Sequence, residues 1–121
     1  MMVKVYCYAK CSTCKKALNW LNENNINYEL IDIKENNPTY EDIKEFHRIS
    51  GYPLKKFFNT SGLLYKEYEL SKKIPNMSEN EMYELLASNG MLVKRPLLIV
   101  DNCDVLVGFN MQEWMNCLLK R

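Results

Sequence analysis

The chain has 121 residues, of which 47% are hydrophobic, and both values are typical of one compact globular domain. Its 16 lysines and arginines are interspersed with 15 aspartates and glutamates, which leaves a formal net charge of +1. A nearly neutral chain without a basic stripe is not expected to bind nucleic acid directly. No apolar run approaches the roughly 20 residues that span a bilayer, so we expect a cytoplasmic protein with no membrane segment.

The beginning of the chain alternates between strand and helix patterns. Residues 2–8 form a short apolar run that predicts a first strand, and apolar residues at three-and-four spacing from Cys14 to Leu21 predict a helix. Residues 28–33 predict a second strand. Because a helix connects the two strands, we expect them to be parallel, with a right-handed crossover.

The middle of the chain is predicted to be helical. Thr39 is expected to cap a helix that ends at Gly51. Residues 78–81 have the pattern of a capping box, and Gly90 is placed to end the helix that follows. We therefore interpret residues 39–90 as a helical insert.

Sheet character returns near the end of the chain. Residues 97–100 and 105–107 are apolar runs separated by a turn, and together they predict an antiparallel hairpin. Asn110 is expected to cap a last helix, with Glu113 three residues later completing the capping pattern. The predicted order is therefore β-α-β, helices, and β-β-α, which is typical of a mixed sheet covered by helices.

A CxxC motif, Cys11 to Cys14, falls where the first predicted strand stops and the first helix begins. A helix N-terminus presents unpaired N–H groups and the positive end of the helix dipole, and both favour an anionic sulfur. Lys10, Lys15 and Lys16 add positive charge, so we predict a lowered pKa for Cys11. Cys14 is close enough to attack a mixed disulfide on Cys11, which predicts reversible dithiol exchange.

Two other interpretations of the motif remain open. A CxxC can be half of a zinc site, but such a site normally needs four ligands, and the remaining cysteines and the single histidine are scattered: Cys7, Cys103, Cys117 and His47. The pair could also be inert buried thiols. We expect no metal and no cofactor. Cys7 fits a buried core thiol at the end of a strand, and His47 fits a structural or surface position on a helix.

Three segments of the sequence resemble the ArsC/Spx family: residues 8–17 around the CxxC, residues 54–62 and residues 94–97. This family contains glutaredoxin-coupled arsenate reductases, Spx-type transcriptional regulators and small uncharacterised arsenate-reductase-like proteins. The chain is most similar to the uncharacterised members, and the resemblance extends over essentially its whole length.

The resemblance implies an α/β, thioredoxin-like (glutaredoxin-like) fold with a mixed sheet. Residues 1–121 would form a single domain of this kind. Within it, residues 1–38 and 91–121 would supply the thioredoxin-like part, and residues 39–90 the helical insert. Pro96 matches the position that is a cis-proline beside the CxxC in these folds, so we expect a cis bond before it.

The resemblance also implies roles for individual residues. Cys11 matches the catalytic cysteine of the arsenate reductases. Cys14 stands where those enzymes usually have serine and Spx proteins have cysteine, so it is expected to resolve the mixed disulfide. Arg95 matches an arginine near the active-site sulfur, and a guanidinium can stabilise a thiolate or hold an anion. The further candidates for lining the substrate site are Lys10, Ser12, Asn59 and Pro96.

Three departures from the family pattern argue against arsenate as the substrate. Arsenate reductases use two further arginines to hold the oxyanion, and Asn59 and Gly108 stand at those positions here. Cys7 replaces the histidine that precedes their catalytic cysteine. With Arg95 alone, the site should bind a dianion poorly, since each charge-assisted hydrogen bond contributes about 1.5–3 kcal/mol.

We therefore predict a thiol-dependent oxidoreductase whose reductant is thioredoxin, glutaredoxin or glutathione. The alternative is an Spx-like redox-sensing regulator that binds the RNA polymerase α subunit. Spx proteins use a glycine in the helical insert for that contact, and Pro53 lies near the corresponding position in this chain.

Overall fold

The computed structural model describes residues 1–120, which form two compact units. The first, here called the sheet unit, comprises Met1–Asp32 and the chain from Arg95 onward. The second, here called the helical unit, comprises Ile33–Lys94 and contains the predicted insert. That the whole chain acts as a single domain stays a prediction.

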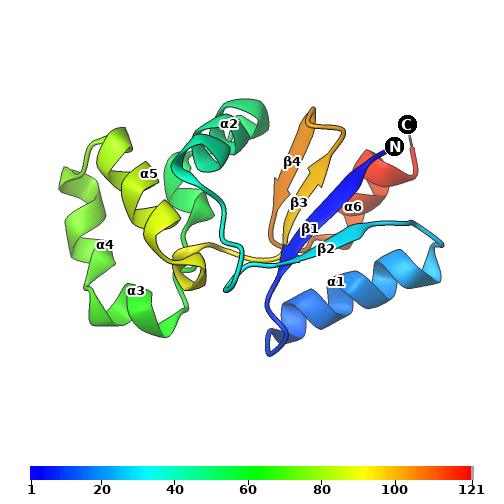
Figure 1. The fold of residues 1–121 in the computed structure, drawn as a ribbon, viewed down its shortest axis with the longest axis horizontal. Coiled ribbons are helices and arrows are strands. Elements are labelled where there is room, and N and C mark those ends of the chain that lie inside the picture. The colour runs from blue at the N-terminus through cyan, green and yellow to red at the C-terminus, as the bar shows by residue number, and fades with distance from the viewer. Residues whose placement is uncertain (121) are drawn as a thin grey trace. The chain divides into compact units, whose positions relative to one another are not determined.

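The sheet unit is built on a four-stranded mixed sheet with the strand order β2-β1-β3-β4 (Figure 1). β1 is parallel to β2, and β3 is antiparallel to β4, as the strand and helix patterns predict. The antiparallel pairing of β1 with β3, which joins the two pairs into one sheet, was not predicted. The elements of this unit are β1 (Val3–Cys7), α1 (Ser12–Glu23), β2 (Glu29–Asp32), β3 (Leu97–Val100), β4 (Asp104–Val107) and α6 (Met111–Leu118). The predicted thioredoxin-like order of β-α-β followed by β-β-α is confirmed.

α1 and α6 contribute to one apolar core together with one face of the sheet. Because side chains alternate along a strand, Val3, Val5 and Cys7 of β1 point to the same face and join this core. The rings of Trp20 and Trp114 meet edge to face, with centroids 6.3 Å apart. This packing fixes α1 against β1, and with it the start of α1 near the end of β1.

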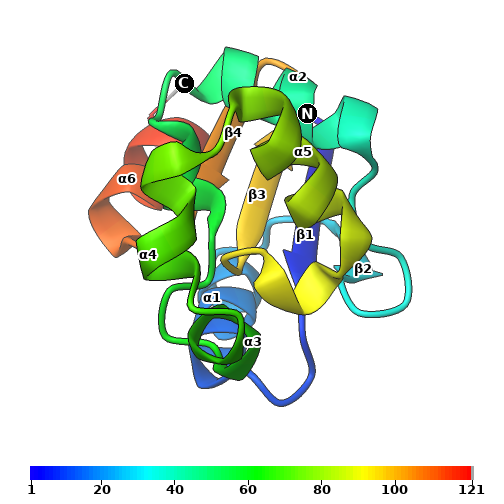
Figure 2. The same ribbon diagram turned by 90° about the vertical axis from the view of Figure 1, so that its left-hand side faces the viewer.

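The helical unit consists of short helices. Its elements are α2 (Tyr40–Ser50), η1 (Leu54–Phe57), α3 (Leu63–Glu67), α4 (Leu70–Lys73), η2 (Ile74–Asn76), α5 (Glu79–Ser88) and η3 (Gly90–Leu92). Of these, α2, α5 and η3 begin at a capping side chain. α2 and α5 lie side by side (Figure 2). Thr39 caps α2, Gly51 ends it in the left-handed conformation, and Ser78 begins a capping box at α5, as predicted. Thr39 also forms a capping box with Asp42, which was not predicted. No helix within residues 1–120 is long and apolar enough to cross a membrane.

Gly90 does not end α5, so that prediction from the sequence is wrong. α5 ends at Ser88, and Asn89 then caps the 3₁₀ turn η3 by accepting the backbone N–H of Met91. Gly90 is needed for a different reason: a Cβ atom there would lie 1.8 Å from the carbonyl oxygen of Ile33. Only a residue without a side chain lets the two backbone segments approach this closely.

Candidate active site

The CxxC motif lies where β1 leads into α1. Cys11 is the N-cap residue of α1, and its sulfur accepts the backbone N–H of Cys14 at 3.4 Å. A sulfur thus occupies the capping position that a serine or aspartate oxygen commonly fills. The predicted placement of the motif at a helix N-terminus is confirmed.

The sulfurs around the start of α1 differ in their access to solvent. Cys11 is half-buried, whereas Cys14 is 1% exposed and Cys7 is 5% exposed. Cys7 and Cys14 belong to the core of the sheet unit, and Cys11 packs against that core. A bulky disulfide substrate can therefore reach Cys11 but not the two sulfurs behind it.

Cys14 is the thiol that the surroundings favour as an anion. A hydrogen bond from the Cys7 thiol is the main cause that lowers the pKa of Cys14 to about 6. Hydrogen bonds from the Tyr8 backbone and the Cys11 thiol, and the charge of Arg95, lower this pKa further. Together they outweigh burial, which disfavours the charged form. Cys14 is therefore largely a thiolate at neutral pH.

The pKa of Cys11 moves in the other direction, which corrects the prediction from the sequence. Burial raises the pKa of Cys11, and the hydrogen bond to Cys14 and the negative charge there raise it further. The backbone N–H of Cys14 and the charge of Arg95 lower it, but they do not compensate. In the reduced protein the anion thus resides on Cys14 and the proton on Cys11.

Arg95 lies close to this group of thiols. Its guanidinium carbon is 5.2 Å from the centroid of the Tyr8 ring. Its positive charge lowers the pKa of each of the neighbouring thiols: Cys7, Cys11 and Cys14. The peptide bond between Arg95 and Pro96 is cis, as the resemblance implies. The arginine is therefore positioned to stabilise negative charge on the sulfurs.

The other residues expected at the site fall in different places. Lys10 and Ser12 are exposed on either side of Cys11. Asn59 belongs to the helical unit, where its backbone N–H donates to the carbonyl of Leu92 at 2.8 Å. A role for these three polar residues at the site stays a prediction.

The sequence did not reveal the contact between Cys7 and Cys14. The interpretation of Cys7 as a buried core thiol is correct, but its hydrogen bond to Cys14 was not foreseen. Strand alternation could have predicted that Cys7 lies near α1, because it places Cys7 on the same face of β1 as Val3 and Val5, and α1 packs against that face.

A cavity of about 240 Å³ adjoins the two buried sulfurs. Its walls are mostly apolar, with one lysine and one aspartate, and all lie in the sheet unit: Cys7, Tyr8, Ala9, Cys14, Lys15, Leu18, Leu30 and Asp32. Cys11 is not part of this lining. Cys7 and Cys14 therefore share a space that Cys11 does not enter.

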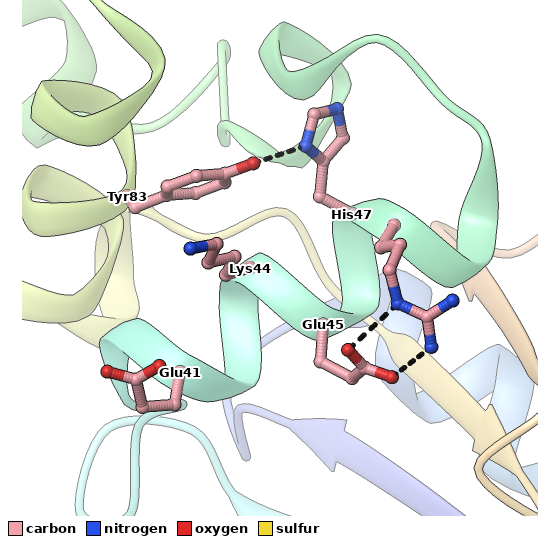
Figure 3. A pocket seen from close by; sticks show the side chains of 6 residues that line it. Glu41, Lys44, Glu45, His47 and Tyr83 are labelled. Carbon is pink, nitrogen blue, oxygen red and sulfur yellow. Dashed lines mark hydrogen bonds and ion pairs between the residues drawn. The ribbon is translucent and has the colours of Figure 1, made fainter.

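A second, wider hollow lies on the helical unit and carries no thiol (Figure 3). His47 on α2 and Tyr83 on α5 point toward one another, and the His47 Nδ1 atom is 2.7 Å from the Tyr83 hydroxyl. Glu45 and Arg48 form an exposed ion pair on α2. His47 thus joins two helices, in keeping with the structural role expected for it.

Among residues 1–120, no group of three or more His, Cys, Asp or Glu side chains is arranged to hold a metal ion.

Comparisons with known proteins match nearly the whole chain to one family. The sequence profile of the ArsC family matches residues 6–117. The uncharacterized protein YusI of Bacillus subtilis (strain 168) is 47% identical over 114 residues, which cover 94% of this chain and 96% of YusI. The global transcriptional regulator Spx 2 of Bacillus anthracis is 30% identical over 112 residues, which cover 93% of this chain and 83% of Spx 2.

A solved structure of a protein from the same family is also similar to this chain. The crystal structure of an ArsC-family-related protein from Bacteroides fragilis is 52% identical and superimposes with a TM-score of 0.92, covering 96% of this chain and 97% of that one. The matched region contains the CxxC motif, Arg95 and Pro96. The chain therefore belongs to the ArsC family, whose thioredoxin-like fold it shares.

Proposed function

We propose that the protein is a thiol-dependent oxidoreductase that reduces disulfides, with Cys11 as the attacking thiol and Cys14 as the resolving thiol. One observation carries this proposal: Cys11, half-buried at the start of α1, contacts a buried Cys14 whose surroundings favour a thiolate. A nucleophile that substrate can reach and a neighbouring sulfur that it cannot reach are the two parts that dithiol exchange needs.

In the first step, Cys11 attacks a disulfide of the substrate. The proton of Cys11 passes to the Cys14 thiolate, to which the Cys11 thiol is already hydrogen-bonded. The sulfur of Cys11 then bonds to one substrate sulfur, and the other substrate sulfur leaves as a thiolate. The backbone N–H of Cys14 and the charge of Arg95 stabilise the Cys11 anion as it forms.

In the second step, Cys14 gives up its proton to the leaving substrate thiolate and attacks the sulfur of Cys11. The mixed disulfide breaks, the remaining substrate sulfur leaves as a thiolate that takes up a proton from solvent, and a Cys11–Cys14 disulfide forms. The substrate disulfide has gained two electrons and the CxxC has lost two. Thioredoxin, glutaredoxin or glutathione then returns the two electrons and restores both thiols.

Arsenate fits this site less well than a disulfide does. Support for this preference comes from Arg95, which contributes a single guanidinium near the thiols. Gly108 has a left-handed backbone with φ +79° and offers no side chain, where the resemblance would require an arginine. A dianionic oxyanion would lack the charge-assisted hydrogen bonds that such sites use, so we infer that disulfides are the better substrate class.

Two cysteine variants test the mechanism with a small disulfide such as oxidised glutathione as substrate. Cys11→Ser is expected to abolish disulfide reduction, because the accessible nucleophile is lost. Cys14→Ser is expected to accumulate a mixed disulfide on Cys11, which intact-protein mass spectrometry detects as one added glutathione that reductant removes. Cys103→Ser is the matched control, since Cys103 is an exposed cysteine in the turn between β3 and β4. Wild-type turnover by Cys11→Ser would rule the mechanism out.

A redox-sensing regulator is the second candidate, and the 30% identity to Spx 2 favours it. An oxidised Cys11–Cys14 pair would then act as a signal, and RNA polymerase through its α subunit would be the partner. The two functions predict different observations. An enzyme turns over a disulfide repeatedly with its reductant, whereas a regulator is retained on purified RNA polymerase in a manner that depends on oxidation.

A further inference from the structure

Cys7 is a buried nucleophile that the proposed exchange does not use. It is the last residue of β1 and lies in the core between the sheet and α1. There its thiol donates a hydrogen bond to the sulfur of Cys14. The two residues also line the same cavity, on the side that does not include Cys11. Cys14 thus has a sulfur neighbour in Cys7 as well as in Cys11.

We propose that Cys7 is a second resolving thiol, so that Cys14 forms a disulfide with either Cys11 or Cys7. This inference rests on the proposed dithiol exchange. In the oxidised protein the sulfur of Cys7 attacks the sulfur of Cys14, and the Cys11–Cys14 bond breaks. Cys11 leaves as a thiolate and takes up the proton that Cys7 loses. One disulfide replaces another, so this step consumes neither an oxidant nor a reductant.

Two groups assist the departure of Cys11 in this rearrangement, although burial, the largest influence on the pKa of Cys11, opposes it. The backbone N–H of Cys14 and the charge of Arg95 stabilise the Cys11 anion, and a stabilised thiolate is a better leaving group. In the reduced protein the hydrogen bond to Cys14 is the main cause that raises the pKa of Cys7, ahead of burial. That first cause disappears once Cys14 is part of a disulfide, which makes Cys7 easier to ionise.

The rearrangement changes which sulfur solvent can reach. A Cys7–Cys14 disulfide joins two side chains that are 5% and 1% exposed, so a bulky reductant cannot contact it directly. Only a small thiol that enters the adjoining cavity of about 240 Å³ has access. Meanwhile the half-buried Cys11 is again a free thiol. The protein can thus store an oxidised pair and keep a reactive cysteine at its surface.

Peptide mapping of the full-length Cys11→Ser variant, oxidised with diamide, tests the proposal. Serine is a good N-cap residue, so the start of α1 is retained. Trypsin cleaves after Lys10, which puts Cys7 and Cys14 on separate peptides. We expect these peptides to be joined by a disulfide, in about tenfold or greater excess over any link from Cys14 to the exposed Cys103, because two thiols that line one cavity have a high effective concentration.

The wild-type protein separates the two proposals in the same experiment. Its Cys11 and Cys14 share one tryptic peptide, so their disulfide appears as a loop within that peptide. If wild type forms the loop but Cys11→Ser gives no Cys7–Cys14 link, or links Cys14 equally to Cys103, the second resolving thiol is overturned and the exchange mechanism stands. If wild type forms neither the loop nor the cross-link, the proposed function itself fails.

Discussion

The sheet unit and the helical unit of this protein differ in both their chemistry and their construction. All cysteines of the chain lie in the sheet unit: Cys7, Cys11, Cys14, Cys103 and Cys117. That unit is built from strand pairings between segments far apart in sequence, whereas the helical unit consists of short helices, the two longest of which, α2 and α5, begin at capping boxes. The comparison teaches that the cysteines belong to the part of the chain whose geometry is set by pairing between distant segments.

The largest expected effect concerns the ionisation of Cys14, whose pKa is lowered from 9.0 to about 6. This shift is roughly a thousandfold change in proton affinity. The ultraviolet absorbance of thiolate should therefore rise as the pH increases through about 6, and Cys14→Ser should lose that transition. Cys7→Ala should move the midpoint to higher pH, because the hydrogen bond from Cys7 is the main cause of the lowered pKa.

The lowered pKa of Cys14 also determines how the stability of the protein changes with pH. The folded pKa of Cys14 lies below its unfolded value of 9.0, so the contribution of Cys14 to folding is fully present above pH 9 and is lost as the pH falls through about 6. Cys103→Ser is the control and should leave the transition near pH 6 unchanged. An unchanged midpoint in Cys7→Ala would contradict the role given to the hydrogen bond between Cys7 and Cys14.

The next effect tests whether the two units unfold together. Phe57 is a fully buried residue of the helical unit, and Phe57→Ala should cost about 3–5 kcal/mol of unfolding free energy. Both tryptophans of the chain, Trp20 and Trp114, lie in the sheet unit, so their fluorescence reports on that unit alone. If the chain is a single domain, as predicted, Phe57→Ala lowers the fluorescence and circular dichroism midpoints in urea equally.

A fluorescence midpoint that stays at its wild-type value in Phe57→Ala would break the single-domain prediction. Trp114→Ala serves as the reciprocal variant, because Trp114 is fully buried in the sheet unit and Trp20 remains as the fluorescent probe. If the fluorescence and circular dichroism midpoints separated in both variants, the two units would unfold independently.

The smallest expected effect comes from the capped helices of the helical unit. Thr39→Ala and Ser78→Ala each remove a side-chain oxygen that accepts a backbone N–H at 3.1 Å, and each should cost about 1 kcal/mol. Arg48→Ala is the matched control, since it breaks only an exposed ion pair and should cause no measurable change. Urea denaturation gives all three values. If Arg48→Ala lowered the unfolding free energy as much as the two cap variants do, the expected contribution of the capping boxes to stability would be contradicted.

Local sequence signals predicted most of the fold. The CxxC at the start of α1, the capping residues Thr39 and Ser78, and the β3–β4 hairpin each depend on residues within a few positions of one another. Such short-range patterns are decided by backbone hydrogen bonding and turn chemistry, which tertiary contacts seldom reverse. The individual helices α3 and α4 within the predicted helical insert were not predicted, because they are too short for a periodic pattern and are separated by a left-handed Glu69.

Two further features that the sequence could not predict depend on contacts between distant segments. The raised pKa of Cys11 follows from burial and from the anion on Cys14, which in turn depends on a thiol at the end of β1. The close approach of Gly90 to Ile33 joins residues at opposite ends of the helical unit. A helix-ending glycine and a glycine at a backbone crossing have the same sequence pattern, so only the folded chain distinguishes them.

The crossing at Gly90 also bears on how this family could diversify. Ile33 is the first residue of the helical unit and Gly90 lies near its last, yet their backbones touch. Segments whose two ends are close together can be lengthened, shortened or exchanged with little disturbance to the rest of a protein. Evolution could therefore remodel this whole insertion without disturbing the sheet or the start of α1, where the CxxC motif lies.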